Sequence, residues 1–209
     1  MTTALLNGAF VGLVYGLFAV GLVIVYRASR TLNFAHGEIG MLGAFVFAEL
    51  HDDRGWPLVI ALLIGPLVSA GIGCAADVVL VRPLLGKARL NLLVATTGLA
   101  AFLLVFASRR YGLGVRFIEP LVGGAGVTTA GFTVRPGQFL ILGVSLTVVG
   151  ALVVLYERTD YGLRLRATAI DHYAAGQVGV NTNAVSMASW GLAGFIAGVS
   201  AILIAPSVA

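Results

Sequence analysis

Long apolar runs separated by short polar segments dominate this chain of 209 residues. A bilayer core about 30 Å thick needs about 20 apolar residues of helix to cross it. Six runs approach or exceed that length. They predict an all-α, polytopic transmembrane helix bundle built as a single domain over residues 1–209. The predicted spans cover residues 4–26, 33–50, 57–81, 90–108, 138–156 and 184–205.

The span predicted at residues 33–50 is the least conventional of the six, because it begins with polar residues. Its first six residues read Asn33-Phe34-Ala35-His36-Gly37-Glu38, and it is apolar only from Ile39 onward. Such a segment either crosses the membrane or re-enters on the same side. The sequence leaves both topologies open.

Two polar segments separate the later spans. Residues 109–137 hold four arginines and a glycine-rich run, which predicts an external loop with room for a short hairpin. Residues 157–183 are long enough for a helix but too charged to cross lipid. We expect one short, weakly amphipathic surface helix there, whose apolar side includes Ile170, Tyr173 and Val178. Such a helix either lies passively on the bilayer or docks a cytoplasmic partner.

The distribution of basic residues indicates the orientation of the bundle, because cytoplasmic loops carry an excess of Lys and Arg. If the segment after the fifth span is cytoplasmic, eight basic residues lie on that side and five on the other. This count favours an outward N-terminus. The eight are Arg27, Arg30, Arg82, Lys87, Arg89, Arg158, Arg164 and Arg166; the five are Arg54, Arg109, Arg110, Arg116 and Arg135.

Composition excludes several classes of protein. Hydrophobic residues make up 59% and charged residues 11%, against roughly 25% charged residues in soluble domains. The chain is therefore too apolar to be soluble or disordered. Its basic residues flank apolar blocks, so they indicate a membrane protein and no nucleic-acid partner. One cysteine, Cys74, allows no disulfide framework, and no catalytic motif or metal-ligand spacing is present.

Small residues recur every four positions in the first and last spans. Residues four apart share one helix face, so a strip of glycines lets another helix backbone approach closely. We predict helix packing at these strips, with sliding during transport as the alternative. The glycines are Gly8, Gly12, Gly16, Gly194 and Gly198.

Ionisable residues near the apolar spans offer candidate functional groups. Asn33, His36 and Glu38 either lie at headgroup level, with Asn33 capping a helix, or line a substrate pathway or gate. Asp77, near the end of the third span, either reaches the membrane interface or forms a buried ion pair with a neighbouring helix.

Taken together, these residues resemble the permease subunits of bacterial ABC importers for branched-chain amino acids, the LivH type. The run from Asn33 to Glu38 is the most specific part of the resemblance, which covers essentially the whole chain. The matching elements are Gly21-Leu22-Val23-Ile24-Val25-Tyr26, Leu32-Asn33-Phe34-Ala35-His36-Gly37-Glu38 with Gly43, Asp77 before Val81-Arg82-Pro83-Leu84, Tyr161-Gly162 through Arg164, Arg166-Ala167 and Asp171, and Gly179-Val180-Asn181-Thr182.

The resemblance implies a multi-pass protein of the bacterial inner membrane that works within a larger transporter. Its partners would be a second, LivM-like permease, two cytoplasmic ATPases that use ATP and Mg, and a periplasmic or lipid-anchored binding protein. The chain itself would bind no cofactor and catalyse no reaction. Residues 157–183 would then be the coupling segment, with Arg164, Arg166, Asp171, His172 and Gly179 as candidate ATPase contacts.

Two departures from the family pattern qualify the resemblance. Related permeases usually continue past the equivalent of Ala209, which implies a truncated subunit, and the coupling segment lacks a second acidic residue beside Asp171. Two other classes of function therefore stay open. One is a passive channel or secondary carrier for a small polar solute such as urea or an amide, with His36 and Glu38 as a proton relay. The other is a purely structural membrane subunit.

Overall fold

The structure is a computed structural model that describes residues 2–30, 32–84, 86–112, 127–129, 132–134 and 136–208. Within this part of the chain, five helical segments are long and apolar enough to cross a membrane. The architecture is the predicted all-α polytopic bundle, because in lipid a helix satisfies all its backbone hydrogen bonds internally. The five segments are Asn7–Ser29, Leu58–Leu84, Leu90–Tyr111, Pro136–Arg158 and Thr182–Pro206.

Helices make up most of the described residues, with one short pair of strands between the fifth and sixth α-helices. In chain order the elements are α1 (Thr2–Ser29), α2 (His36–Ala48), the π-helix η1 (Glu49–Asp53), α3 (Leu58–Ala76), the π-helix η2 (Asp77–Val81), α4 (Arg82–Leu84), α5 (Arg89–Tyr111), β1 (Val127–Thr129), β2 (Phe132–Val134), α6 (Pro136–Arg158), α7 (Asp160–Ile170), α8 (His172–Gln177) and α9 (Thr182–Val208).

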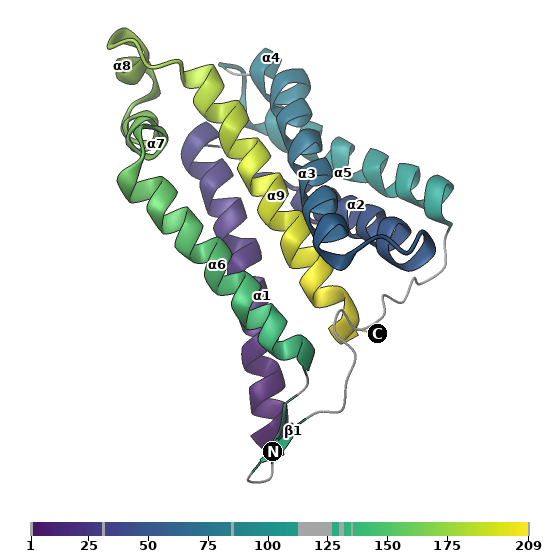
Figure 1. Ribbon diagram of the computed structural model, residues 1–209. Coiled ribbons are helices and arrows are strands. Elements are labelled where there is room, and N and C mark those ends of the chain that lie inside the picture. Colours follow the sequence, from purple (N-terminus) through teal and green to yellow (C-terminus); the bar gives the residue numbers. More distant parts are fainter. Residues whose placement is uncertain are drawn as a thin grey trace.

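Helix α9 forms the centre of the bundle. It packs against α1 on one side and against α2 and α3 on the other, while α6 covers α1 and α5 covers α2 (Figure 1). Helices α4, α7 and α8 lie together at one end of the bundle, and the N-terminus lies at the opposite end with the strands (Figure 1). The core is therefore built around α9, which the chain reaches last.

The hairpin predicted within residues 109–137 is present. Strands β1 and β2 pair antiparallel, with Val127 opposite Val134 and Thr129 opposite Phe132. The flanking helices extend further than predicted, since α5 continues to Tyr111 and α6 begins at Pro136.

The segment predicted as the second span is a short helix preceded by a non-helical stretch. Helix α1 ends at Ser29, and Arg30 adopts a left-handed conformation with φ of 53°. Helix α2 starts only at His36 and has 13 residues, too few to cross a bilayer core alone. The chain nevertheless joins opposite ends of the bundle here, because α3 then returns toward α4 (Figure 1). This connection favours a crossing over re-entry.

Candidate functional site

The polar residues at the start of α2 lie inside the bundle. Asn33 and His36 are 4% and 2% exposed. The Oδ1 of Asn33 accepts a hydrogen bond from the backbone N–H of Ala35 at 3.0 Å, a local turn that precedes the helix. The residue at the helix cap is Ala35, which makes no side-chain capping bond. Asn33 therefore shapes the approach to α2 but is not its N-cap, so the capping role offered by one of the two interpretations is absent.

The imidazole of His36 rests against the middle of α1. Its Nε2 lies 3.2 Å from the carbonyl oxygen of Phe18, and the two rings tilt against each other with centroids 4.5 Å apart. Phe18 is eleven residues before the end of α1, roughly 16 Å of helix rise. This depth and burial contradict a headgroup-level position for His36.

Gly21 makes room for that imidazole. A Cβ built on Gly21 would lie 2.8 Å from Nε2 of His36 and 3.4 Å from the carbonyl oxygen of Ala193 in α9. Helices α1, α2 and α9 thus meet at Gly21, where α1 carries no side chain. Gly21 was not among the glycines predicted for packing, because it falls outside the four-residue repeat of the earlier ones.

Glu38 differs from its two neighbours in the same polar run. It lies in the first turn of α2 and is half-buried, beside the exposed Gly37. No salt bridge found among the described residues involves Glu38. Of the three pathway candidates, Asn33 and His36 are thus packed into the bundle, and Glu38 is the one with an accessible surface.

Close backbone contacts join α3 to α9. A Cβ on Gly194 would collide with the carbonyl oxygen of Ser69, and one on Gly198 would lie 2.8 Å from the Cα of Pro66. Further along, a Cβ on Gly73 would collide with the carbonyl oxygen of Trp190. We call this line of contacts the α3–α9 seam. Gly194 and Gly198 therefore lie at a close helix contact.

A four-residue spacing in α3 mirrors the one in α9. Small or polar residues recur at Gly65, Ser69, Gly73 and Asp77, one face of the helix. The same kind of repeat was thus present in the sequence of the third span, where no packing strip was predicted. Helix α2 joins the same block, because a Cβ on Gly40 would lie 2.6 Å from the carbonyl oxygen of Ala197.

The glycines of α1 behave differently. Gly8, Gly12 and Gly16 are exposed, and a Cβ built on any of them would have no heavy atom within 4 Å. The packing contact predicted for these three is therefore absent among the described residues. Their spacing places them on one face, but spacing alone does not supply a neighbouring helix.

Asp77 is fully buried, so it does not reach out to the membrane interface. Its Oδ2 lies 3.1 Å from Nε of Arg82, and its Oδ1 accepts a hydrogen bond from Ser186 of α9 at 2.5 Å. Of the two interpretations of the sequence, the structure has the buried ion pair, but the predicted partner from a neighbouring helix is wrong. The cationic partner comes from the same helical run, and α9 contributes a hydroxyl.

The segment after α6 forms two helices, so the expectation of one surface helix is wrong. Asp171 has an extended backbone that ends α7 and begins α8. Its Oδ1 accepts hydrogen bonds from the backbone N–H groups of Tyr173 and Ala174 at 2.9 and 3.0 Å, a regular N-cap. Asp171 thus turns the chain between α7 and α8.

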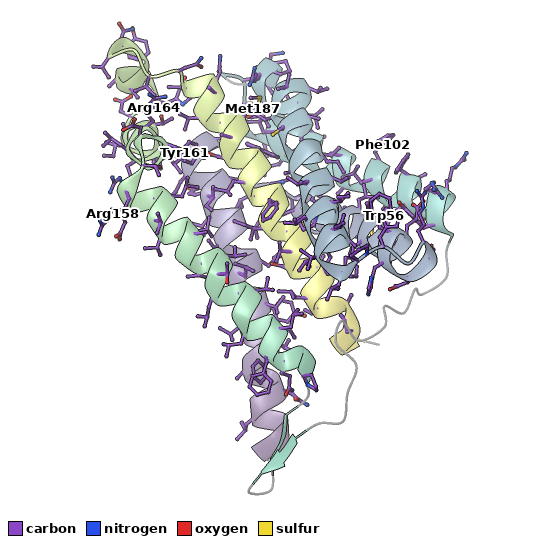
Figure 2. All side chains as sticks on the ribbon, viewed as in Figure 1. Trp56, Phe102, Arg158, Tyr161, Arg164 and Met187 are labelled. Atoms are coloured by element: carbon purple, nitrogen blue, oxygen red, sulfur yellow. The ribbon has the colours of Figure 1, made fainter. Side chains whose placement is uncertain are left out.

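Helix α7 is fastened to three spans. Thr159 caps it by accepting from the N–H of Gly162 at 3.3 Å, and a Cβ on Gly162 would collide with the carbonyl oxygen of Tyr156 in α6. Arg30 donates to the carbonyl oxygen of Ala169, which ties α7 to the end of α1. The hydroxyl of Tyr161 lies 2.8 Å from that of Ser189 in α9. Tyr161 and Arg164 lie beside the upper end of α6 (Figure 2).

Burial raises the pKa of the Tyr161 phenol above its usual value, although the hydrogen bond with Ser189 lowers it in part. The phenol therefore stays protonated at physiological pH, and its contact with α9 is independent of pH there.

The far end of the segment carries exposed apolar side chains. Ile170, Tyr173 and Val178, which the amphipathic pattern had placed on the apolar side, are 83%, 77% and 79% exposed. The interior side of α7 is formed instead by Gly162, Leu165 and Thr168. We call the three exposed residues the apolar tip. The candidate ATPase contacts Arg164, Arg166, Asp171, His172 and Gly179 are also exposed, and Gly179 has a φ of 87° that favours glycine.

A charged cluster at the opposite end of the bundle was not anticipated. Glu49 of η1 lies 2.5 Å from Nη2 of Arg54 and 3.1 Å from Nη2 of Arg110 at the end of α5. The hydroxyl of Tyr111 donates to its other oxygen at 3.3 Å. This cluster ties the segment after α2 to α5. The contacts of Glu49 with Arg110 and Tyr111 join residues about 60 positions apart, so no local sequence pattern predicts the cluster.

These features define a class of protein. Within the described residues, no group of three or more His, Cys, Asp or Glu side chains could hold a metal ion. What the structure does contain is a helical membrane bundle with a tightly packed centre, a polar crossing segment and a two-helix segment at one end. The chain is an integral, multi-pass membrane protein.

Comparisons with known proteins identify the family. The sequence model described as "Branched-chain amino acid transport system / permease component" matches residues 4–209. The chain belongs to this family of membrane permeases, as the resemblance in the sequence had implied.

Curated relatives carry matching names. The chain is 29% identical to the high-affinity branched-chain amino acid transport system permease protein LivH of Escherichia coli (strain K12), over 95% of this chain and 68% of that protein. It is 29% identical to the corresponding BraD protein of Pseudomonas aeruginosa, over 96% of this chain and 69% of that protein. A probable LivH permease of Methanocaldococcus jannaschii is 27% identical over 88% of this chain and 60% of that protein. No solved structure gives a significant match.

Proposed function

We propose that this chain is the membrane-spanning permease subunit of an ATP-driven importer and forms part of the translocation pathway for branched-chain or related small amino acids. Its partners would be a second permease, two cytoplasmic ATPases and a substrate-binding protein. The names of the relatives support the substrate class. ATP hydrolysis would take place on the ATPases, which would bind the nucleotide and Mg.

The apolar tip is the observation that carries this proposal. Large apolar side chains that gather outside the candidate spans indicate an interaction surface, and we assign this one to the ATPases. The tip begins at the last residue of α7, a helix that hydrogen bonds fasten to α1 and α9, and continues through α8. A partner bound there could move these spans, which is what an energy-coupling contact requires.

The polar crossing segment supports a place on the pathway. Ionisable side chains within a membrane bundle usually face a partner or a cavity. Glu38 is half-buried and takes part in none of the salt bridges found in the described part of the chain. We propose that Glu38 faces the route taken by the substrate, whereas Asn33 and His36 hold the local geometry.

A docking experiment tests the role of the tip. Tyr173→Ala should lower co-purification of the ATPases at least about tenfold, because an aromatic anchor at an interface often contributes 2 kcal/mol or more, roughly thirtyfold. Trp56→Ala is the matched control, since Trp56 is also an exposed aromatic but lies at a distance from α7 (Figure 2). Asp171→Arg would be a poorer probe, because Asp171 caps α8. Equal co-purification of both variants would contradict docking at the tip.

Transport itself tests the class of function. In proteoliposomes that contain this permease with its partner permease, ATPases and binding protein, we expect radiolabelled leucine uptake only when ATP is enclosed with the ATPases. Uptake that persists without ATP and follows an imposed proton gradient would instead indicate a secondary carrier, with His36 and Glu38 as the candidate relay.

A further inference from the structure

A buried carboxylate connects the end of α3 to the start of α9. The side chain of Asp77 has no exposed surface, so its charge must be compensated within the protein. Its two oxygens have different partners: Arg82 Nε lies 3.1 Å from Oδ2, and the hydroxyl of Ser186 donates to Oδ1 at 2.5 Å. Arg82 also donates through Nη2 to the backbone carbonyl of Asn183 at 3.3 Å. Two hydrogen bonds thus run from the α3 side to the first turns of α9.

The π-helical turn of η2 makes this arrangement possible. In an α-helix, residues five apart point about 140° away from each other, because each residue advances about 100°. In a π-helix the backbone bonds join residues five apart. Here the N–H of Arg82 donates to the carbonyl oxygen of Asp77. Arg82 therefore lies one π-helical turn after Asp77, on the same side of the helix. The wider turn therefore lets one guanidinium reach both Asp77 and α9.

The connection is made where the two-helix segment enters the bundle. Helix α8 ends at Gln177, and α9 starts at Thr182, one residue before the carbonyl that Arg82 holds. Beyond Ser186, the α3–α9 seam continues with Gly73 against the backbone of Trp190. The glycines of this seam let the two helices approach closely, but they carry no side chains that would interlock against sliding along it. A displacement of α8 therefore reaches α9 at the turn that is tied to α3.

We propose that Asp77, Arg82 and Ser186 form a transmission clamp, which makes α3 follow α9 when the α7–α8 segment is displaced during the transport cycle. These are positioning residues and need not touch the substrate. The inference rests on the proposed function, because it presupposes that a partner displaces α7 and α8. Without the clamp, the ATPases would turn over while α3 and the helices packed on it lag behind.

A pair of variants separates transmission from simple stabilisation. Arg82→Met leaves the Asp77 carboxylate buried and unpaired, so membrane yield and thermal midpoint should fall. The double variant Asp77→Leu with Arg82→Met removes both charges, and replacing a buried ion pair by apolar residues is often neutral for stability. We expect the double variant to recover yield and thermal midpoint, yet to transport about fivefold less leucine per ATP hydrolysed than the unaltered protein. Recovery of the transport-to-ATP ratio together with stability would overturn the proposal.

A milder variant gives an independent measurement. Ser186→Ala removes the hydroxyl that α9 donates to Asp77 and leaves the ion pair in place. The matched control is Ser200→Ala, a buried serine on the same helix whose hydroxyl has no partner among the described residues. Leucine uptake and phosphate release are measured in the same proteoliposomes, with the complete transporter. The ratio of uptake to hydrolysis should fall for Ser186→Ala and not for Ser200→Ala, and equal ratios would refute the clamp.

The two proposals fail in distinguishable ways. If the unaltered protein takes up leucine without ATP, the proposed function is wrong. If its uptake depends on ATP and the double variant keeps the normal ratio, the function stands and the clamp is wrong.

Discussion

The α3–α9 pair and the α1–α6 pair of this permease both contain glycines spaced four residues apart, but, among the described residues, only in the first pair do these glycines pack against another helix. Along the α3–α9 seam, glycines let the two backbones approach closely. In the candidate span of α9, 67% of the apolar stretch is buried. Helices α1 and α6 share an apolar cluster that includes Leu17 and Val148. The α1 glycines Gly8, Gly12 and Gly16 are open, and only 6% of the candidate span in α6 is buried. A four-residue glycine repeat therefore indicates a face, and only the fold decides whether that face is occupied.

The difference suggests a division between a rigid block and a more adjustable side. A glycine contact has no side-chain rotamer to change, so the spacing between α3 and α9 is fixed, whereas larger side chains can repack by changing rotamer. We infer that α2, α3 and α9 move together and that α1 and α6 can adjust against them. The open face of α1 is also available to lipid or to another subunit.

The largest expected effect tests the comparison directly. Gly194→Val places a branched side chain against the carbonyl oxygen of Ser69, and overpacking of this kind should cost about 3 kcal/mol, the upper end of the usual range. Gly12→Val makes the same chemical change where nothing lies within 4 Å and should leave stability nearly unaltered. Thermal unfolding of the isolated chain in detergent measures both. Equal losses would mean that the seam is no tighter than the α1 face.

Hydropathy was sufficient to predict the bundle. The ends of α1, α5 and α9 fall within a few residues of the predicted spans, because lipid requires long uninterrupted helices. Residues 33–50 were less predictable. Their polar start signalled an unusual segment, but the non-helical return along α1 depends on Gly21 and His36 meeting across 15 positions.

The candidate site was predictable only in part. The sequence pointed to Asn33, His36, Glu38 and Asp77, yet their burial and partners come from tertiary contacts. Asp171 did carry a local signal for the start of a new helix, since Asp is a strong N-cap. The expectation of one helix within residues 157–183 left that signal unused. That expectation also put Ile170 and Tyr173 on one face of a single helix, whereas they lie in α7 and α8.

A smaller effect is expected where α1 meets the rigid block. Gly21→Ala places a methyl group 2.8 Å from Nε2 of His36, so the imidazole must shift at a cost of about 1–2 kcal/mol. In a His36→Ala background the same glycine substitution should cost much less, because the obstructing ring is gone. A double-mutant cycle of thermal stability measures this coupling. An unchanged cost in both backgrounds would show that the ring yields freely.

The smallest effect tests whether the fastening of α9 extends to α7. Tyr161→Phe removes only the hydroxyl that meets Ser189 at 2.8 Å, which should lower stability by about 1 kcal/mol. Tyr173→Phe is the matched control, because that ring is 77% exposed and its hydroxyl should contribute less than about 0.5 kcal/mol. Thermal midpoints in detergent decide between them. If the two variants are equally stable, the hydroxyl contact does not fasten α7, and the apolar cluster that contains Leu165 and Val185 holds the segment to α9 instead.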